Sequence, residues 1–159
     1  MSSLVGQPAP EIDLPVAGGG DNFKLSDSKG KEPVVLLFFP LAWTGICTQQ
    51  MCEARDAMAQ YAALGAKVIG ISVDSQFALA KFKEEQGLTF DLASDANRVA
   101  VTAFGNKHDE AIGGVLGVAK RSAFVIDKDG IVVYADIKPS PKEVPAVADI
   151  KAALEAAAK

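Results

Sequence analysis

The continuous apolar run VVLLFF, at residues 34–39, restricts the possible folds more than any other feature of the sequence. A run of strand length without polar alternation is typical of a strand buried on both faces of a sheet. Pro40 ends the run, because proline has no N–H for a sheet ladder. A helix is predicted over 48–64, which lacks Pro and Gly, and a second buried strand over 67–73. A strand–helix–strand unit of this kind implies a crossover and parallel strands.

The rest of the sequence predicts a mixed sheet covered by helices. Two pairs of short apolar segments, each separated by polar and glycine-containing turns, are typical of β-hairpins. Glycine end signals, an Asp cap and an Ala-rich stretch indicate three further helices. The hairpins span 11–25 and 122–135, and the helices span 75–86, 96–104 and 143–159. Together these elements predict one α/β domain over residues 1–159, with an N-terminal β-hairpin and a mixed central β-sheet flanked by helices.

Composition argues against several classes of function. The 159 residues carry a formal net charge of −4 and the basic side chains are scattered, so nucleic-acid binding is not expected. No apolar run approaches the ~20 residues that cross a bilayer, and no secretory signal is visible. A cytoplasmic protein is therefore expected, in which thiols stay reduced. The two cysteines, Cys47 and Cys52, accordingly indicate either thiol chemistry or simple packing.

Cys47 lies where the predicted strand passes into the predicted helix. The unpaired N–H groups and the positive dipole of a helix start both stabilise a thiolate, which lowers the pKa of a cysteine there. Thr44 supplies a hydroxyl that can cap the backbone or donate to a sulfur or a bound oxygen, and Gly45 leaves room for a small ligand. Pro40 makes the turn rigid. The alternative, that the thiols are small buried hydrophobic groups, stays open, above all for Cys52.

The spacing of the two cysteines limits how they can pair. In a helix, positions 47 and 52 are roughly 140° apart around the axis and about 7.5 Å apart along it. Their Cα atoms would then be roughly 8–9 Å apart, beyond the ~7 Å limit for a disulfide. If the two cysteines pair, the first turns of the helix must unwind.

Other thiol chemistries fit the sequence less well. The Cys-x-x-Cys pattern of a thioredoxin-type dithiol is absent, and two cysteines with one histidine fall short of a four-ligand zinc site. A cysteine hydrolase needs a base, for which His108 is the one histidine; a histidine in such a polar loop is expected to be solvated.

The pattern Pro40-x-x-x-Thr44-x-x-Cys47, with Arg121 ahead of the segment 122–127, resembles the active-site signature of the peroxiredoxin family. The resemblance covers nearly the whole chain. It implies a thioredoxin-like fold and a thiol peroxidase that needs no cofactor and no metal.

The resemblance points to two subgroups at once. Cys52, five residues after Cys47, is similar to the second cysteine of the bacterioferritin-comigratory or peroxiredoxin Q group, which resolves the first cysteine within one chain. The segment 40–47 looks more like the one-cysteine alkyl hydroperoxide reductase E group. Gly45 stands where a Pro is frequent and Gln50 where a Glu is common, so a usual acidic partner of the arginine region is missing. Subgroup, reductant and the choice between monomer and homodimer therefore stay open.

The resemblance also implies a role for each residue of the signature. Cys47 attacks hydrogen peroxide or an organic hydroperoxide and becomes a sulfenic acid. Arg121 supplies positive charge, Thr44 holds the peroxide oxygens, and Pro40 closes the site to bulk water. Cys52 then forms an intramolecular disulfide, which a thioredoxin-like dithiol reduces.

Three alternatives remain at this point. The chain could be a non-catalytic redox sensor or chaperone, a one-cysteine peroxidase resolved by an external thiol, or a thiol hydrolase that uses Cys47 and His108. Without the resemblance, Arg121 would be expected on the surface beside an edge strand. Arg55 and Asp56 are expected to form a structural ion pair or a solvated helix face.

Overall fold

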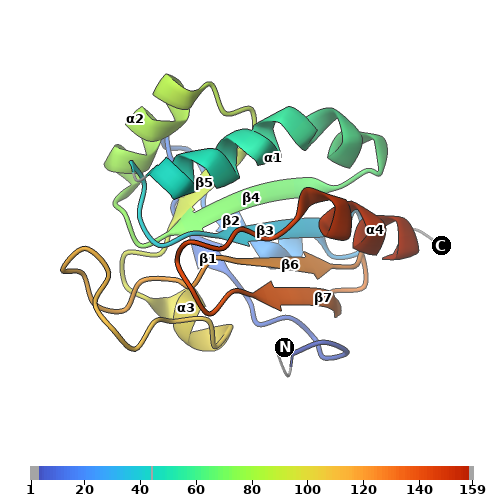
Figure 1. Ribbon diagram of the computed structural model, residues 1–159. Helices are drawn as coiled ribbons and strands as arrows, with labels where there is room; N and C mark the ends of the chain where they lie inside the picture. Colours follow the sequence, from blue (N-terminus) through green and yellow to red (C-terminus); the bar gives the residue numbers. More distant parts are fainter. Residues whose placement is uncertain (1–3, 44, 158–159) are drawn as a thin grey trace.

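The computed structural model describes residues 4–43 and 45–157, in which the side chains of residues 46–48 are not described. The strands are β1 (Asp13–Leu14), β2 (Phe23–Lys24), β3 (Val34–Phe38), β4 (Lys67–Ser72), β5 (Asp91–Ser94), β6 (Ser122–Ile126) and β7 (Val132–Ile137). The helices are α1 (Gly45–Ala63), α2 (Gln76–Gln86), α3 (Val99–Ala103) and α4 (Val147–Ala157), with a 3-10 helix η1 (Leu25–Ser28). Five strands form one sheet in the order β5-β4-β3-β6-β7, and β1 and β2 form a small hairpin (Figure 1).

Strand β3 lies at the centre of the sheet, and all five of its residues are buried. It pairs in parallel with β4, where Phe38 lies opposite Ile71, and antiparallel with β6, where Phe38 lies opposite Ser122. The predicted doubly covered strand and the predicted mixed sheet are both confirmed. This register places Arg121, the residue just before β6, at the edge of the sheet where β3 ends.

Helices cover one face of the sheet, and mostly shorter elements cover the other. Helices α1, α2 and α4 pack on the face formed by Val35, Leu37 and Val68, with Met51 and Leu154 among the buried residues they contribute (Figure 1). The hairpin β1–β2, η1 and α3 pack on the opposite face, which carries Leu36, Phe38 and Ile69. The residues of β3 therefore alternate between two hydrophobic cores, as a central strand with both faces covered requires.

Capping interactions explain where α2 begins and ends and where α3 begins. The Ser75 hydroxyl accepts a hydrogen bond from the Ala78 amide, which caps the start of α2, and Gly87 ends that helix with a left-handed φ of 62°. The buried Asp95 carboxylate accepts from the amides of Ala100 and Val101 at the start of α3. The predicted capping role of Asp95 is therefore confirmed, although the helix begins at Val99 and is shorter than the predicted 96–104.

Two other elements differ from what the sequence predicted. Strand β5 was not predicted, because its four residues DLAS contain no β-branched or aromatic side chain and begin and end with polar ones. The last helix begins at Val147 rather than at residue 143, because Pro145 is poorly tolerated in a helix interior. Within residues 4–43 and 45–157, no helix is both long enough and apolar enough to cross a membrane.

Candidate active site

The candidate site lies at the carboxyl end of β3, where a short loop leads into α1. The Phe39 amide still bonds to the Ile71 carbonyl at 3.0 Å, and Pro40 is buried directly after it. Helix α1 begins at Gly45, three residues before the predicted start at residue 48, so Cys47 is its third residue and lies in its first turn. Thr44 lies outside the described residues, and so does the side chain of Cys47.

Arg121 is buried beside α1, with 3% of its surface exposed, so the expectation of a surface arginine from its sequence context is wrong. Its Nη1 donates to Gln50 Oε1 at 3.1 Å, and its Nε donates to the Pro141 carbonyl at 2.7 Å. Gln50 is itself buried, and its Nε2 donates to the Phe38 carbonyl at 3.4 Å. One glutamine thus joins the end of β3 to the arginine that precedes β6.

In the described part of the chain, the partners of Arg121 leave its positive charge uncompensated. Among the described residues, no carboxylate lies within 4.0 Å of its guanidinium. The groups that accept its hydrogen bonds are a neutral amide and a backbone carbonyl, which satisfy the donors without cancelling the charge. The resemblance in sequence pointed to a Glu as the common residue at position 50. Because Gln50 is neutral, it preserves the positive potential of the buried guanidinium.

The loop between β3 and α1 is held by a residue that the sequence did not single out as functional. Asp74 Oδ2 accepts from the Ala42 amide at 2.7 Å and from the Ser72 hydroxyl at 2.7 Å. Trp43, the next residue of the loop, has a positive φ of 74°. A carboxylate directly after a buried strand was a signal that could have pointed to Asp74, because the carboxyl ends of parallel strands meet at one edge of the sheet.

Cys52 lies further along α1 in a different environment. Its thiol is half-buried and donates to Gln86 Oε1 at 3.7 Å. Arg55 Nη1 donates to the Gln86 carbonyl at 2.6 Å, and Arg55 Nε lies 3.1 Å from the Asp56 carboxylate, as the sequence predicted. The arrangement connects the middle of α1 to the last residue of α2.

His108 is buried rather than solvated, which corrects the sequence expectation. Only 8% of its surface is exposed, and its Nε2 has no hydrogen-bond partner among the described residues. Burial lowers the pKa of His108, and the nearby charge of Lys120 lowers it further. The backbone amide of His108 donates to the Val118 carbonyl at 2.8 Å, which fastens it within the loop that leads to β6.

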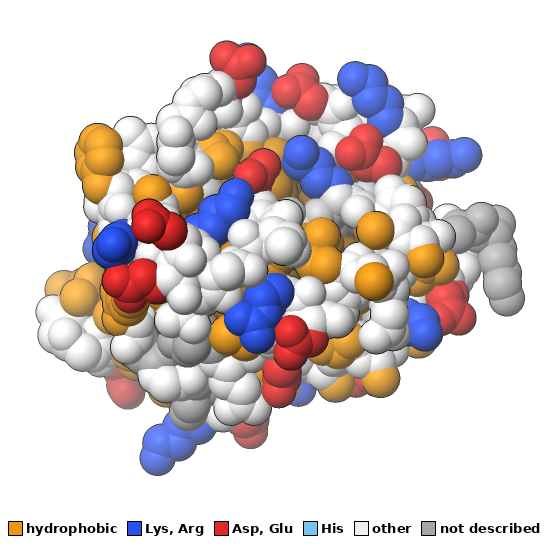
Figure 2. Space-filling model, turned by 90° about the horizontal axis from the view of Figure 1, so that it is seen from above, with side chains coloured by type: hydrophobic (Ala, Val, Ile, Leu, Met, Phe, Trp, Pro, Cys, Tyr) orange, Lys and Arg blue, Asp and Glu red, His pale blue; other side chains and the backbone are white. Residues whose placement is uncertain are grey.

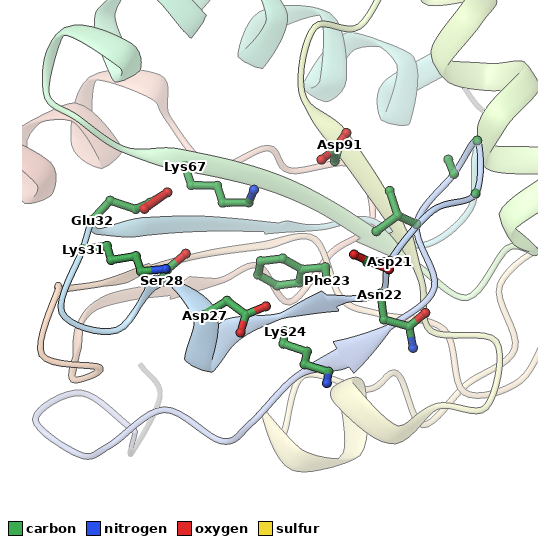
Figure 3. A pocket seen from close by; sticks show the side chains of 14 residues that line it. Asp21, Asn22, Phe23, Lys24, Asp27, Ser28, Lys31, Glu32, Lys67 and Asp91 are labelled. Atoms are coloured by element: carbon green, nitrogen blue, oxygen red, sulfur yellow. The ribbon is translucent and has the colours of Figure 1, made fainter.

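A polar cavity of about 440 Å³ lies at the opposite end of the sheet, where β3 and β4 begin (Figure 3). Its lining includes the basic residues Lys24, Lys31 and Lys67 and the acidic residues Asp21, Asp27, Glu32 and Asp91. On the face covered by α1, α2 and α4, basic and acidic side chains are interspersed (Figure 2).

In the part of the chain that the structure describes, no three His, Cys, Asp or Glu side chains gather as a metal site would require.

Comparison with known proteins identifies the family. Residues 5–135 match the AhpC/TSA family. Peroxiredoxin Bcp of Bacillus subtilis is 39% identical over 134 residues, which are 84% of each chain. The crystal structure of peroxidoxin BcpB from Mycobacterium tuberculosis superposes with a TM-score of 0.83 at 34% identity, covering 98% of this chain and 97% of the other.

A second solved structure comes from a protein named for the bacterioferritin-comigratory group, one of the two subgroups that the sequence resembles. The bacterioferritin comigratory protein of Xanthomonas campestris superposes with a TM-score of 0.79 at 28% identity, covering 93% of this chain and 92% of the other. These likenesses confirm the thioredoxin-like fold with its N-terminal hairpin. The chain therefore belongs to the AhpC/TSA family and is a peroxiredoxin, a thiol peroxidase.

Proposed function

We propose that the thiol peroxidase activity resides in Cys47 and depends on the unpaired charge of Arg121. The observation that carries this proposal is the buried guanidinium, which Gln50 and Pro141 fix beside the first turns of α1 and which has no carboxylate partner among the described residues. Position 47 precedes position 50 by about one helical turn, so the two lie on the same side of α1. A cation in such a low-dielectric place favours the thiolate and polarises a bound peroxide.

In the proposed reaction, the thiolate of Cys47 attacks one peroxide oxygen. An S–O bond forms as the O–O bond breaks, and the leaving oxygen takes the bonding electron pair and a proton to become water or an alcohol. Sulfur loses two electrons, the peroxide gains them, and Cys47 is left as a sulfenic acid. Thr44 and the amides of the first turn hold the two oxygens in line, and the buried Pro40 keeps bulk water out.

The second step forms a disulfide within the chain. The thiolate of Cys52 attacks the Cys47 sulfenic sulfur, the S–O bond breaks, and water leaves. The first turns of α1 unwind for this step, because an intact helix keeps the two cysteines too far apart to bond. A thioredoxin-like dithiol then supplies two electrons and restores both thiols.

The substrates proposed are hydrogen peroxide and organic hydroperoxides. The Xanthomonas campestris relative is described with an alkyl peroxide reduction activity, which supports an organic substrate for this chain as well.

The test uses the chain's own fluorophore, since Trp43, the only tryptophan, directly precedes Thr44. Wild type, Cys47→Ser and Cys52→Ser are mixed with peroxide in a stopped-flow instrument, and the products are identified by mass spectrometry. Cys47→Ser should lose all peroxide consumption, and retained consumption would refute the assignment. Cys52→Ser should complete one oxidation to sulfenic acid and form no internal disulfide. If thioredoxin still recycles Cys52→Ser at the wild-type rate, the one-cysteine mechanism is correct instead.

A further inference from the structure

We propose that Asp74 is a positioning residue for peroxide reduction. Its carboxylate fixes the loop of residues 40–43, which leads to Thr44 and Cys47. This inference rests on the proposed function of Cys47. It concerns a residue that follows β4, whereas Arg121 precedes β6, and among the described residues the Arg121 side chain bonds to Gln50 and Pro141 rather than to Asp74.

The contacts of Asp74 form a rigid connection between the loop and the sheet. One carboxylate oxygen, Oδ2, accepts from both the Ala42 amide and the Ser72 hydroxyl at 2.7 Å. Hydrogen bonds to an ionised acceptor are shorter and stronger than those between neutral groups. Asp74 is itself held in place, because its amide donates to Ser72 Oγ at 3.2 Å and its carbonyl accepts from the Ser94 hydroxyl at 2.6 Å. The ends of β4 and β5 therefore fix the carboxylate, and the carboxylate fixes the loop.

The residue after Ala42 shows why this anchor is needed. Trp43 adopts a left-handed backbone conformation, with a φ of 74°, which non-glycine residues avoid because of their Cβ atom. Such a conformation persists only where its surroundings impose it. The indole of Trp43 packs edge-on against Phe82 at a ring-centroid distance of 5.3 Å but leaves 48% of its surface exposed. Packing on one side thus gives partial support, and the bond from Ala42 to Asp74 fixes the backbone on the other.

The consequence for catalysis is geometric. In-line attack on a peroxide needs the oxygens held at a defined distance from the sulfur, and a displacement of about 1 Å can cost about 100-fold in rate. Ionisation of Cys47 depends instead on Arg121 and the helix start. Loss of the Asp74 anchor should therefore slow the reaction with peroxide far more than the reaction with a reagent that needs only a thiolate.

The experiment compares two reactions of Cys47 in Asp74→Ala, Asp74→Asn and Asp127→Ala, all in a Cys52→Ser background. The first reaction is oxidation by hydrogen peroxide, and the second is alkylation by iodoacetamide at the same pH. Asp74→Ala should lower the ratio of the two rate constants by about 10- to 100-fold, and Asp74→Asn, which keeps an acceptor oxygen without the charge, should lower it less. Asp127→Ala is the matched control, since it removes a carboxylate that likewise accepts from two backbone amides, those of Asp129 and Ile131, in the turn between β6 and β7. Its ratio should equal that of the parent.

A second measurement keeps this inference separate from the proposed function. Release of the loop should red-shift the emission of Trp43 and raise its quenching by acrylamide in Asp74→Ala, whether or not Cys47 reacts with peroxide. If the parent fails to react with peroxide, the proposed function fails while the fluorescence still tests the anchor. If the parent reacts with peroxide but Asp74→Ala keeps both the parental ratio of rate constants and the parental emission, the role of Asp74 is overturned. Should Asp74→Ala fail to fold, the same criterion applies to Asp74→Asn.

Discussion

The beginning and the middle of α1 each bring an arginine to a glutamine, yet the two arrangements differ in burial and in charge. At the beginning, Arg121 is 3% exposed and donates to the side chain of Gln50, with no carboxylate in ion-pair range among the described residues. In the middle, the side chain of Arg55 is 35% exposed and donates to the backbone of Gln86, with the Asp56 carboxylate 3.1 Å away.

The comparison shows that an arginine near a thiol is not enough to activate it. A half-exposed cation next to a carboxylate exerts little net field, because water and the counter-charge screen it. A buried cation with neutral partners keeps its field for whatever lies beside it. Under the proposed mechanism, this difference separates an attacking cysteine at the first turn from a resolving cysteine further along the same helix.

The strongest way to break the comparison is to remove each arginine in turn. Arg121→Ala should slow the oxidation of Cys47 by about 100-fold, the range found when one preorganised charge-stabilising donor is lost. Arg55→Ala should change that rate by less than about twofold, because its charge is already paired and exposed. Stopped-flow tryptophan fluorescence measures both rates, and similar losses in the two variants would contradict the distinction.

A smaller change tests whether the missing carboxylate matters. Gln50→Glu keeps the hydrogen bond to Arg121 but places a negative charge on it, which should raise the pKa of the Cys47 thiol and slow oxidation at neutral pH by about tenfold. The pH dependence of iodoacetamide alkylation measures that pKa. Gln50→Met, of similar length and uncharged, serves as a control because it removes the hydrogen bonds of Gln50 to Arg121 and Phe38 without adding a charge. An unchanged alkylation profile in Gln50→Glu would show that the field of Arg121 does not reach the sulfur.

The middle of α1 is probed by Gln86→Leu, which removes the oxygen that accepts the hydrogen bond of the Cys52 thiol. Oxidation of Cys47 should be unaffected, whereas disulfide formation should be about two- to threefold faster, because one weak hydrogen bond no longer holds the Cys52 thiol in its reduced position. Quenched-flow mixing followed by mass spectrometry follows the disulfide directly. A slower disulfide step would mean that Gln86 guides Cys52 toward Cys47 instead.

The last prediction concerns stability rather than rate. His108, the only histidine, lies in the loop that leads to Arg121, and its pKa is lowered below 6.5 chiefly by burial and then by Lys120. The unfolded chain therefore takes up a proton as the pH falls through 6.5 while the folded chain does not, so the free energy of unfolding should fall from there toward the lowered pKa. His108→Gln should flatten this slope in urea unfolding measured between about pH 7.5 and pH 5. An identical slope in both proteins would show that His108 is not buried in solution.

Much of the fold could be predicted because the relevant signals are local. The apolar run of β3, the glycine after α2 and the Asp cap of α3 each report on their own neighbourhood in the sequence. Strand β5 escaped prediction because four residues without β-branched or aromatic side chains carry no such signal, and its place in the sheet comes from pairing with β4.

The candidate site was less predictable from the residues alone. The bond between Gln50 and Arg121 joins positions 71 apart, and only the register of β3 against β6 brings them together. Sequence context alone favoured a surface location for Arg121, and resemblance to the peroxiredoxin signature was needed to select it. The burial of His108 and the anchoring of the loop by Asp74 likewise depend on segments that come together only in the folded chain.

The distance along the chain between α1 and β6 also has a consequence for how the protein is made. Synthesis proceeds from the N-terminus, so the helix that carries both thiols is made before Arg121 and the strand β6 that follows it. Under the proposed mechanism, a nascent chain holds an ordinary, slowly reacting thiol, and oxidant sensitivity arises only once β6 has joined β3. On the same mechanism, a ribosome-bound chain that ends before Arg121 should react with peroxide no faster than a free thiol does.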